Sequence, residues 1–87
     1  MFSQDATLEF VYDDETRARL VTDAVSREVG EIDDGRSRTT VERDGSVVTL
    51  EIDARDLTAL RAALNTWFTL IDVAERTAEV GDRIVDG

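Results

Sequence analysis

A turn signal near the middle of the chain constrains the fold more than any other feature. Asp44-Gly45 lies within residues 38–53, where apolar and polar residues alternate on both sides of the dipeptide. Such a dipeptide predicts a two-residue β-hairpin turn, in which Val41 faces Val48. The residues that then share one face of the hairpin are apolar, as a core face requires: Val41, Val48, Leu50 and Ile52.

The same register places opposite charges across the hairpin. Arg38 faces Glu51 and Arg36 faces Asp53, and such cross-strand pairs stabilise neighbouring strands. Together with Arg43, these two arginines form the densest basic cluster of the chain. They are predicted either to form the cross-strand ion pairs or to contact phosphate groups within a larger assembly. The register favours the ion pairs.

The segments before the hairpin predict a strand and a helix. Residues 7–12 alternate and predict the strand, and the acidic residues 13–15 suit the N-terminus of a helix. A stripe of apolar residues follows at helical spacing, and Gly30 is a natural stop for this helix. The stripe consists of Ala18, Val21, Val25 and Val29.

The segment after the hairpin predicts a second, longer helix. It begins after N-cap candidates in residues 53–56 and ends near Val80, where Gly81 stops it and residues 81–87 form a flexible tail. Residues 1–87 then form a single α+β domain with the order β-α-β-β-α. A right-handed crossover makes the first two strands parallel. We therefore expect a mixed or antiparallel three-stranded sheet of order 1-3-2, with both helices on one face.

The second helix is unusually apolar. Residues 56–75 contain four charged residues, although 34% of the chain is charged. One apolar stripe is predicted to cover the sheet, and it consists of Leu57, Leu60, Leu64, Trp67, Phe68, Ile71, Ala74 and Ala78. A second apolar line lies beside it, formed by Ala59, Ala62, Ala63, Leu70 and Val73. This line either packs against Leu20 and Ala24 of the first helix or stays exposed and docks another protein, and periodicity leaves both open.

The composition excludes several classes of function. Twenty acidic residues accompany ten arginines, and histidine, cysteine and lysine are absent. No nucleophile–base pair can form without these residue types, so we expect no catalytic residue, metal site or cofactor. The net charge of −10 opposes binding of nucleic acid by the isolated chain and is typical of a halophilic protein. Neither a signal-peptide pattern nor a membrane-spanning apolar run is present, so we expect a cytoplasmic protein.

Three segments resemble the Pcc family of small subunits of the KEOPS complex, called LAGE-like in animals. The most specific is DLTALRAALNTWF, residues 56–68, which follows RSRTTVERDGSVVTLEI, residues 36–52, and LEFVYDDE, residues 8–15. The shared pattern is an arginine-serine strand start, a hairpin, an acid-leucine pair and a helix rich in leucine, arginine and alanine. The positions that match the family's second helix are Leu57, Leu60, Arg61, Ala62, Leu64 and Asn65, and Arg38 matches its strand arginine.

The resemblance implies a non-catalytic, dimerising scaffold subunit of the halophilic archaeal type. The KEOPS complex makes N6-threonylcarbamoyladenosine in tRNA, and its Kae subunit is the transferase. The family's two helices pack against helices of Kae, and the subunit dimerises with itself or with a Pcc-like paralogue. It aids tRNA binding only within the complex, and no membrane is involved.

On this basis we expect exposed parts of the two helices to bind the partner. The residues in question are Leu20, Ala24, Ala59, Arg61, Ala63, Leu70 and Val73. Two alternatives remain at this point. One is a stand-alone KH-like RNA-binding module, which requires a GxxG loop and a basic groove that this sequence lacks. The other is a small regulatory domain with a ligand pocket.

Overall fold

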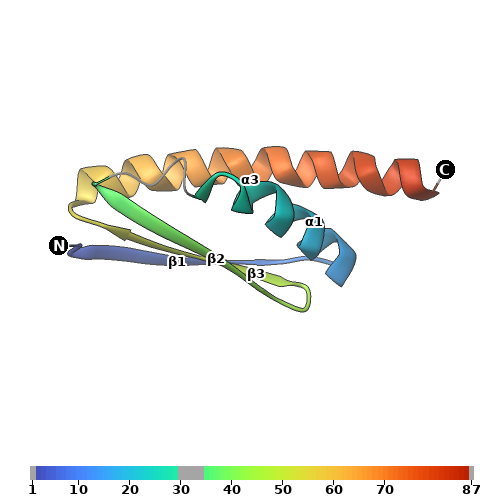
Figure 1. Cartoon of the computed structure of the whole chain (residues 1–87), viewed down its shortest axis with the longest axis horizontal. Coiled ribbons are helices and arrows are strands. Elements are labelled where there is room, and N and C mark those ends of the chain that lie inside the picture. Colours follow the sequence, from blue (N-terminus) through green and yellow to red (C-terminus); the bar gives the residue numbers. More distant parts are fainter. Residues whose placement is uncertain (1, 30–34, 87) are drawn as a thin grey trace.

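Three strands and two helices make up the domain. The computed structural model describes residues 2–29 and 35–86. Their elements, in order, are β1 (Gln4–Val11), α1 (Glu15–Ser26), β2 (Ser37–Asp44), β3 (Val47–Ala54) and α3 (Leu57–Asp86). The sheet is antiparallel with the order β1-β3-β2, and both helices lie on one of its faces (Figure 1). The predicted α+β class, element order and strand order are confirmed.

The core lies between the helices and the sheet. β3 is central, and its inward residues Val48, Leu50, Ile52 and Ala54 are fully buried. The largest buried side chain is Trp67 of α3, whose Nε1 donates a hydrogen bond to Oγ1 of Thr39 at 3.0 Å. Because a buried polar group without a partner is costly, this bond lets an indole N–H and a threonine hydroxyl lie inside the core. α1 contributes Ala18, Val21 and Val25.

The hairpin turn differs from the predicted one. Asp44 lies opposite Val47, so the two turn residues are Gly45 and Ser46. Gly45 has a φ of 61°, and no other described residue has a positive φ. A two-residue turn with a positive φ only at its first position is of type II′, which favours glycine there. An Asp44-Gly45 turn of type I′ would instead force an aspartate to a positive φ.

The shifted turn moves the register of the hairpin by two residues. Arg38 therefore lies opposite Asp53, and the predicted pairs of Arg38 with Glu51 and Arg36 with Asp53 are wrong. Likewise Val41 faces Leu50 rather than Val48. Since side chains alternate with a period of two, this shift leaves every residue on its predicted face.

Both helices begin at aspartate caps. The Oδ1 atom of Asp14 accepts a hydrogen bond from the N–H of Arg17, and that of Asp56 accepts one from the N–H of Ala59, each at 2.7 Å. Such caps satisfy N–H groups that the helix itself leaves unpaired. α1 ends at Ser26, and its predicted stop at Gly30 lies outside the described residues.

The end of α3 was predicted too early. The helix continues through Gly81 to Asp86, where residues 81–86 were expected to form a tail. A glycine ends a helix by adopting a left-handed conformation, and within the described residues only Gly45 has a positive φ. Flexibility of residues 81–87 in solution stays a prediction.

Candidate partner-binding site

An apolar groove runs between the outer surfaces of α1 and α3. Its hollow has a volume of about 140 Å³. The lining residues are Ala24, Val25 and Glu28 of α1 with Leu70, Val73, Ala74 and Thr77 of α3. Ala24 carries only a methyl group, so it leaves room beside the larger side chains of Leu70 and Val73 that also line the hollow. The groove therefore offers a mostly apolar seat for a side chain of a partner helix.

The groove brings together three of the seven residues predicted to bind a partner. Ala24, Leu70 and Val73 line it, and Leu20 lies one turn before Ala24 on α1. Val73 is 53% exposed and Leu20 is 39% exposed, so both are accessible on the outer surfaces of the two helices. Leu70 is half-buried and also packs on the core. Partner binding by these residues stays a prediction.

The expected exposure of Ala59 and Ala63 is wrong. They are only 3% and 5% exposed, and both belong to the core. Their small side chains let α3 approach the rest of the domain closely, so the stripe that α3 buries is rotated toward the alanines. The residues that α3 buries are Ala59, Leu60, Ala63, Trp67, Ile71, Ala74 and Ala78.

The rotation exposes two residues that were assigned to the core. Leu57 is 52% exposed and Phe68 is 50% exposed. At 100° per residue, both lie on the same flank of α3 as Arg61, away from the groove. Arg61 is exposed as predicted, but this placement separates it from Leu70 and Val73. The sequence signal was available, since Leu57 and Phe68 lie at the edge of the apolar arc.

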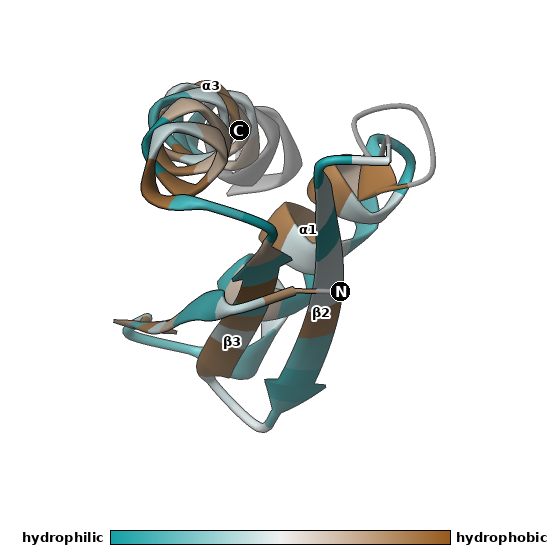
Figure 2. Cartoon of the chain, turned by 90° about the vertical axis from the view of Figure 1, so that its left-hand side faces the viewer, coloured by the Kyte–Doolittle hydropathy of each residue, from teal (hydrophilic) through white to brown (hydrophobic). Residues whose placement is uncertain are grey.

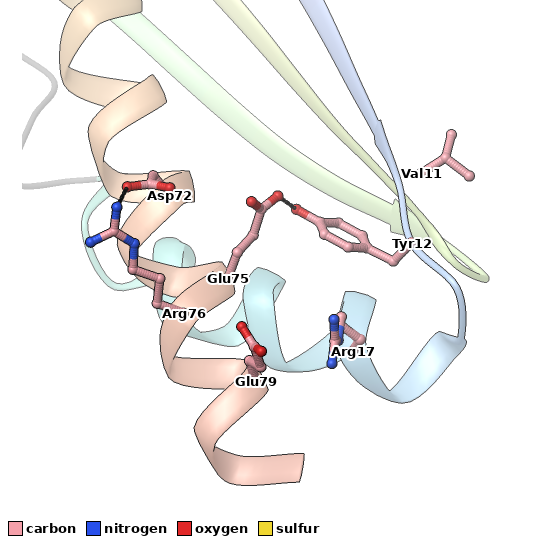
Figure 3. A pocket seen from close by; sticks show the side chains of 7 residues that line it. All are labelled: Val11, Tyr12, Arg17, Asp72, Glu75, Arg76 and Glu79. Atoms are coloured by element: carbon pink, nitrogen blue, oxygen red, sulfur yellow. Dashed lines mark hydrogen bonds and ion pairs between the residues drawn. The ribbon is translucent and has the colours of Figure 1, made fainter. Parts of the chain in front are cut away.

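A second depression, of about 420 Å³, lies where the end of β1 meets α3 (Figure 3). The hydroxyl of Tyr12 donates a hydrogen bond to Oε2 of Glu75 at 2.8 Å. Burial raises the pKa of Tyr12 above its usual value, and the hydrogen bond and negative charge of Glu75 raise it further. The lining is polar and charged apart from one valine: Val11, Tyr12, Arg17, Asp72, Glu75, Arg76 and Glu79. Sequence reasoning missed this pair, because its residues are 63 positions apart.

The arginines considered for tRNA lie at the other end of the sheet, where β2 begins. The guanidinium of Arg38 lies 5.5 Å from the centre of the Phe2 ring, within the range of a cation–π contact. The carbonyl oxygen of Arg36 accepts a hydrogen bond from the N–H of Arg55 at 3.0 Å, which brings a third arginine to this end. Contact with tRNA stays a prediction.

The described residues contain no group of three or more acidic side chains placed to hold a metal ion. Within the same part of the chain, no helix is both long and apolar enough to cross a membrane. The most apolar hollow described above is the groove between α1 and α3. A small antiparallel sheet with two helices on one face defines an α+β domain.

The family of this domain is shown by its sequence. Residues 5–79 match the family model described as transcription factor Pcc1, and the chain therefore belongs to the Pcc1 family. No curated protein sequence matches the chain.

A solved structure shares the fold. The chain is similar to a chain in the crystal structure of the binary complex Gon7–Pcc1, with a TM-score of 0.70 and 14% sequence identity. The match covers 98% of this chain and 99% of that one. At this identity the likeness establishes the fold, and it extends over the whole domain.

Proposed function

We propose that this chain is a non-catalytic, dimerising scaffold subunit of the KEOPS complex, in which it supports N6-threonylcarbamoyladenosine modification of tRNA. It binds the Kae transferase subunit through α1 and α3 and dimerises with itself or with a paralogue. It contacts tRNA only within the complex. The observation that carries this proposal is the apolar groove between the two helices of a chain that belongs to the Pcc1 family.

The groove suits helices of a partner. Val73 is an exposed aliphatic side chain that lines the groove, and Leu20 is an exposed aliphatic side chain one turn before Ala24 on α1. An amphipathic helix buries its apolar face in such a groove, and two helices laid on two others make a four-helix bundle. Burying Leu20 and Val73 contributes about 1.5–3 kcal/mol for each side chain that becomes fully buried.

Charge and composition support the remaining parts of the proposal. A net charge of −10 on 87 residues is more compatible with high intracellular salt, which screens the repulsion, than with dilute buffer. Without histidine, cysteine and lysine, the side chains that most often act as nucleophile, base or metal ligand are missing. We therefore propose a halophilic, cytoplasmic subunit without catalytic chemistry or cofactor of its own.

Co-purification with the Kae subunit tests the proposal. Val73→Asp puts a charge into the groove and should reduce Kae binding at least tenfold, because a carboxylate in an apolar interface loses its hydration. Phe68→Asp is the matched control, since Phe68 is 50% exposed and Val73 is 53% exposed on the opposite flank. Retention of Kae by Val73→Asp, or failure of the natural chain to bind Kae, would contradict the proposal.

A stand-alone nucleic-acid-binding module is the alternative that the name of the family model raises. The charge of the sheet face opposite the helices is unfavourable for this alternative, because the phosphates of nucleic acid are bound by lysine and arginine side chains. Alternation along the strands places six acids and one arginine there: Asp5, Glu9, Glu42, Asp44, Glu51, Asp53 and Arg38. Binding of RNA or DNA by the purified chain at physiological salt, measured by fluorescence anisotropy, would support the alternative.

A further inference from the structure

One carboxylate lines the otherwise uncharged groove between α1 and α3. Figure 2, in which α3 is seen end-on, shows α1 beside it on the same side of the sheet. Glu28 lies two residues after the end of α1, and its backbone N–H donates to the carbonyl oxygen of Val25 at 3.0 Å. This bond holds the residue against the last turn of the helix. The other lining residues are aliphatic or threonine: Ala24, Val25, Leu70, Val73, Ala74 and Thr77.

Glu28 is half-buried, as are three other charged side chains of the described residues. Those three have partners. Arg43 forms an ion pair with Glu15 at 3.2 Å, Glu75 accepts the hydrogen bond of Tyr12 at 2.8 Å, and Arg17 is also partnered. Within the part of the chain that the structure describes, the side chain of Glu28 has neither an ion pair nor a hydrogen bond. It is therefore the exception among the half-buried charges.

The polar side chains nearest to Glu28 in the groove or the sequence do not serve it. The hydroxyl of Thr77 has one proton, which it donates to the carbonyl oxygen of Val73 at 3.0 Å. Arg76 already forms an ion pair within its own helix, at 2.9 Å. Arg27 is exposed, and its helical backbone places it about 100° from Glu28 around the axis of α1. Among the described residues, the groove thus supplies the carboxylate with no donor.

The end of α1 adds to the negative potential in this part of the groove. The last turn of a helix leaves carbonyl groups unpaired and carries a partial negative charge. A basic side chain often compensates this charge, but the last turn of α1 contains none. A cation placed beside Glu28 therefore interacts favourably both with the carboxylate and with the end of the helix.

A helix that docks in the groove removes water from Glu28. If the docking face is wholly apolar, the carboxylate loses hydration and gains nothing, which is costly. If the docking face carries an arginine or a lysine, a charge-assisted hydrogen bond replaces the lost water. The groove therefore discriminates between two helices that fill its apolar hollow equally well.

The spacing along α1 defines the pattern that the docking helix needs. The hollow lies beside Ala24, one turn before Glu28. Residues three or four apart on a helix lie on the same face, about 5–6 Å apart along its axis. A helix that runs alongside α1 therefore needs an aliphatic residue and a base three or four positions apart.

We propose that Glu28 determines which helix the groove accepts. The partner is a helix of the Kae subunit that puts an aliphatic side chain into the hollow and an arginine or lysine, three or four residues away, against the carboxylate of Glu28. This inference rests on the proposed function and deepens it, since it names the chemistry by which the Kae helix is recognised.

Removal of the charge tests the role of Glu28. Glu28→Gln should raise the dissociation constant of the Kae complex about tenfold or more, because the base on the partner then lacks its acid. The melting temperature of the free variant should stay equal or rise, since no partner within the described residues is lost. Asp23→Asn is the matched control, because it removes the same charge from an exposed position of α1, about 140° around the helix. Isothermal titration calorimetry and thermal denaturation measure the two quantities.

Each result of this experiment is decisive. Kae binding by Glu28→Gln as tight as that by Asp23→Asn overturns the proposal, since the hollow alone would then suffice. A lower melting temperature of free Glu28→Gln also overturns it, because Glu28 would then stabilise the chain itself. Weaker Kae binding together with unchanged or higher stability supports it.

A charge exchange identifies the base on the partner. Glu28→Arg should weaken Kae binding more than Glu28→Gln does, because two bases then meet in the groove. Each arginine or lysine on the docking helices of Kae is exchanged for glutamate in turn. One of these Kae variants should bind Glu28→Arg more tightly than it binds the natural chain. If none does, no single base pairs with Glu28 and the proposal fails.

The salt dependence distinguishes a direct pair from long-range attraction. Salt at about 1 M screens exposed charges beyond about 3 Å, whereas a pair shielded from water is screened much less. The ratio of the dissociation constants of Glu28→Gln and the natural chain should therefore stay near tenfold between the lowest salt that keeps the chain folded and about 1 M. A ratio that falls to one would show that Glu28 acts only at long range, which overturns the direct pair.

The results separate this inference from the proposed function. A natural chain that does not bind Kae overturns the proposed function and the inference with it. Loss of Kae binding by Val73→Asp but not by Glu28→Gln leaves the proposed function intact and overturns only the role of Glu28.

Discussion

The two flanks of α3 are equally exposed and differently built. On the α1 side, Val73 and Leu70 line an apolar groove together with a small residue of α1, Ala24. On the β1 side, Leu57 and Phe68 alternate with charged residues above the edge strand β1. An apolar groove with a single carboxylate favours an apolar partner face with one base, whereas an alternating flank carries charges of both signs between its apolar residues. The two flanks of α3 therefore offer surfaces of different chemistry.

The buried face of α3 lies between the two flanks and supports both. Truncating its largest side chain should therefore have the largest effect on stability. Trp67→Ala removes the largest buried side chain and leaves Thr39 without its hydrogen bond. We expect a loss of about 3–5 kcal/mol in the free energy of unfolding, which is most of the stability of a small domain. Urea denaturation in molar salt measures it. A loss below about 1.5 kcal/mol would show that the two flanks do not share a common core.

Overpacking of the core should have the next largest effect. Ala63→Leu adds a larger side chain at a position that is 5% exposed, and should cost about 1–3 kcal/mol of unfolding free energy. Ala62→Leu is the control, because Ala62 is its exposed neighbour on the same helix. Thermal denaturation of the two variants compares them. Equal stability of the two variants would show that the core accommodates a larger side chain at position 63.

On the β1 side, the hydrogen bond between Tyr12 and Glu75 should have a smaller, pH-dependent effect. Tyr12→Phe should cost about 1 kcal/mol at neutral pH. Since the folded-state pKa of Tyr12 is raised, its stabilisation is complete below the unfolded pKa of about 10 and is lost as pH rises above it. The unfolding free energy of the natural chain should therefore fall more steeply between about pH 10 and 12 than that of the variant. Parallel alkaline profiles would contradict this role of Tyr12.

The smallest effect on folding should come from Asp72. Its ion pair with Arg76 spans one turn, and both side chains are more than half exposed. Asp72→Asn should therefore change the unfolding free energy of the monomer by about 0.5 kcal/mol or less. Thermal denaturation of the variant and the natural chain measures the difference. A loss above about 1.5 kcal/mol would show that the pair contributes more than an exposed ion pair does.

The elements could be predicted from the sequence because their signals are local. Asp14 and Asp56 precede helices, and alternation marks each strand. The strand order also followed, since one hairpin and one right-handed crossover leave few arrangements. By contrast, the end of α3 at Asp86 was missed because Gly81 is a stop only if it adopts a positive φ.

The candidate site could be predicted only in part. Periodicity marked Leu70 and Val73 as lying beyond the stripe that covers the sheet, and left open whether they pack on α1 or stay exposed. In the structure both line the groove with Ala24, while partner binding stays a prediction. Ala59 and Ala63 were misplaced, since a broad apolar arc does not say which of its residues face inward. The exposure of Phe68 was missed for the same reason.

By itself the sequence determined the elements, their order and the face of each strand residue, because these depend on periods of two and 3.6 residues and on local caps. Only the tertiary structure decided the rotation of α3 about its own axis and the register of the hairpin. The rotation follows from the close approach that Ala59 and Ala63 permit, and the register from the positive φ of Gly45. Both depend on contacts between elements or on one backbone angle, and a periodic pattern encodes neither.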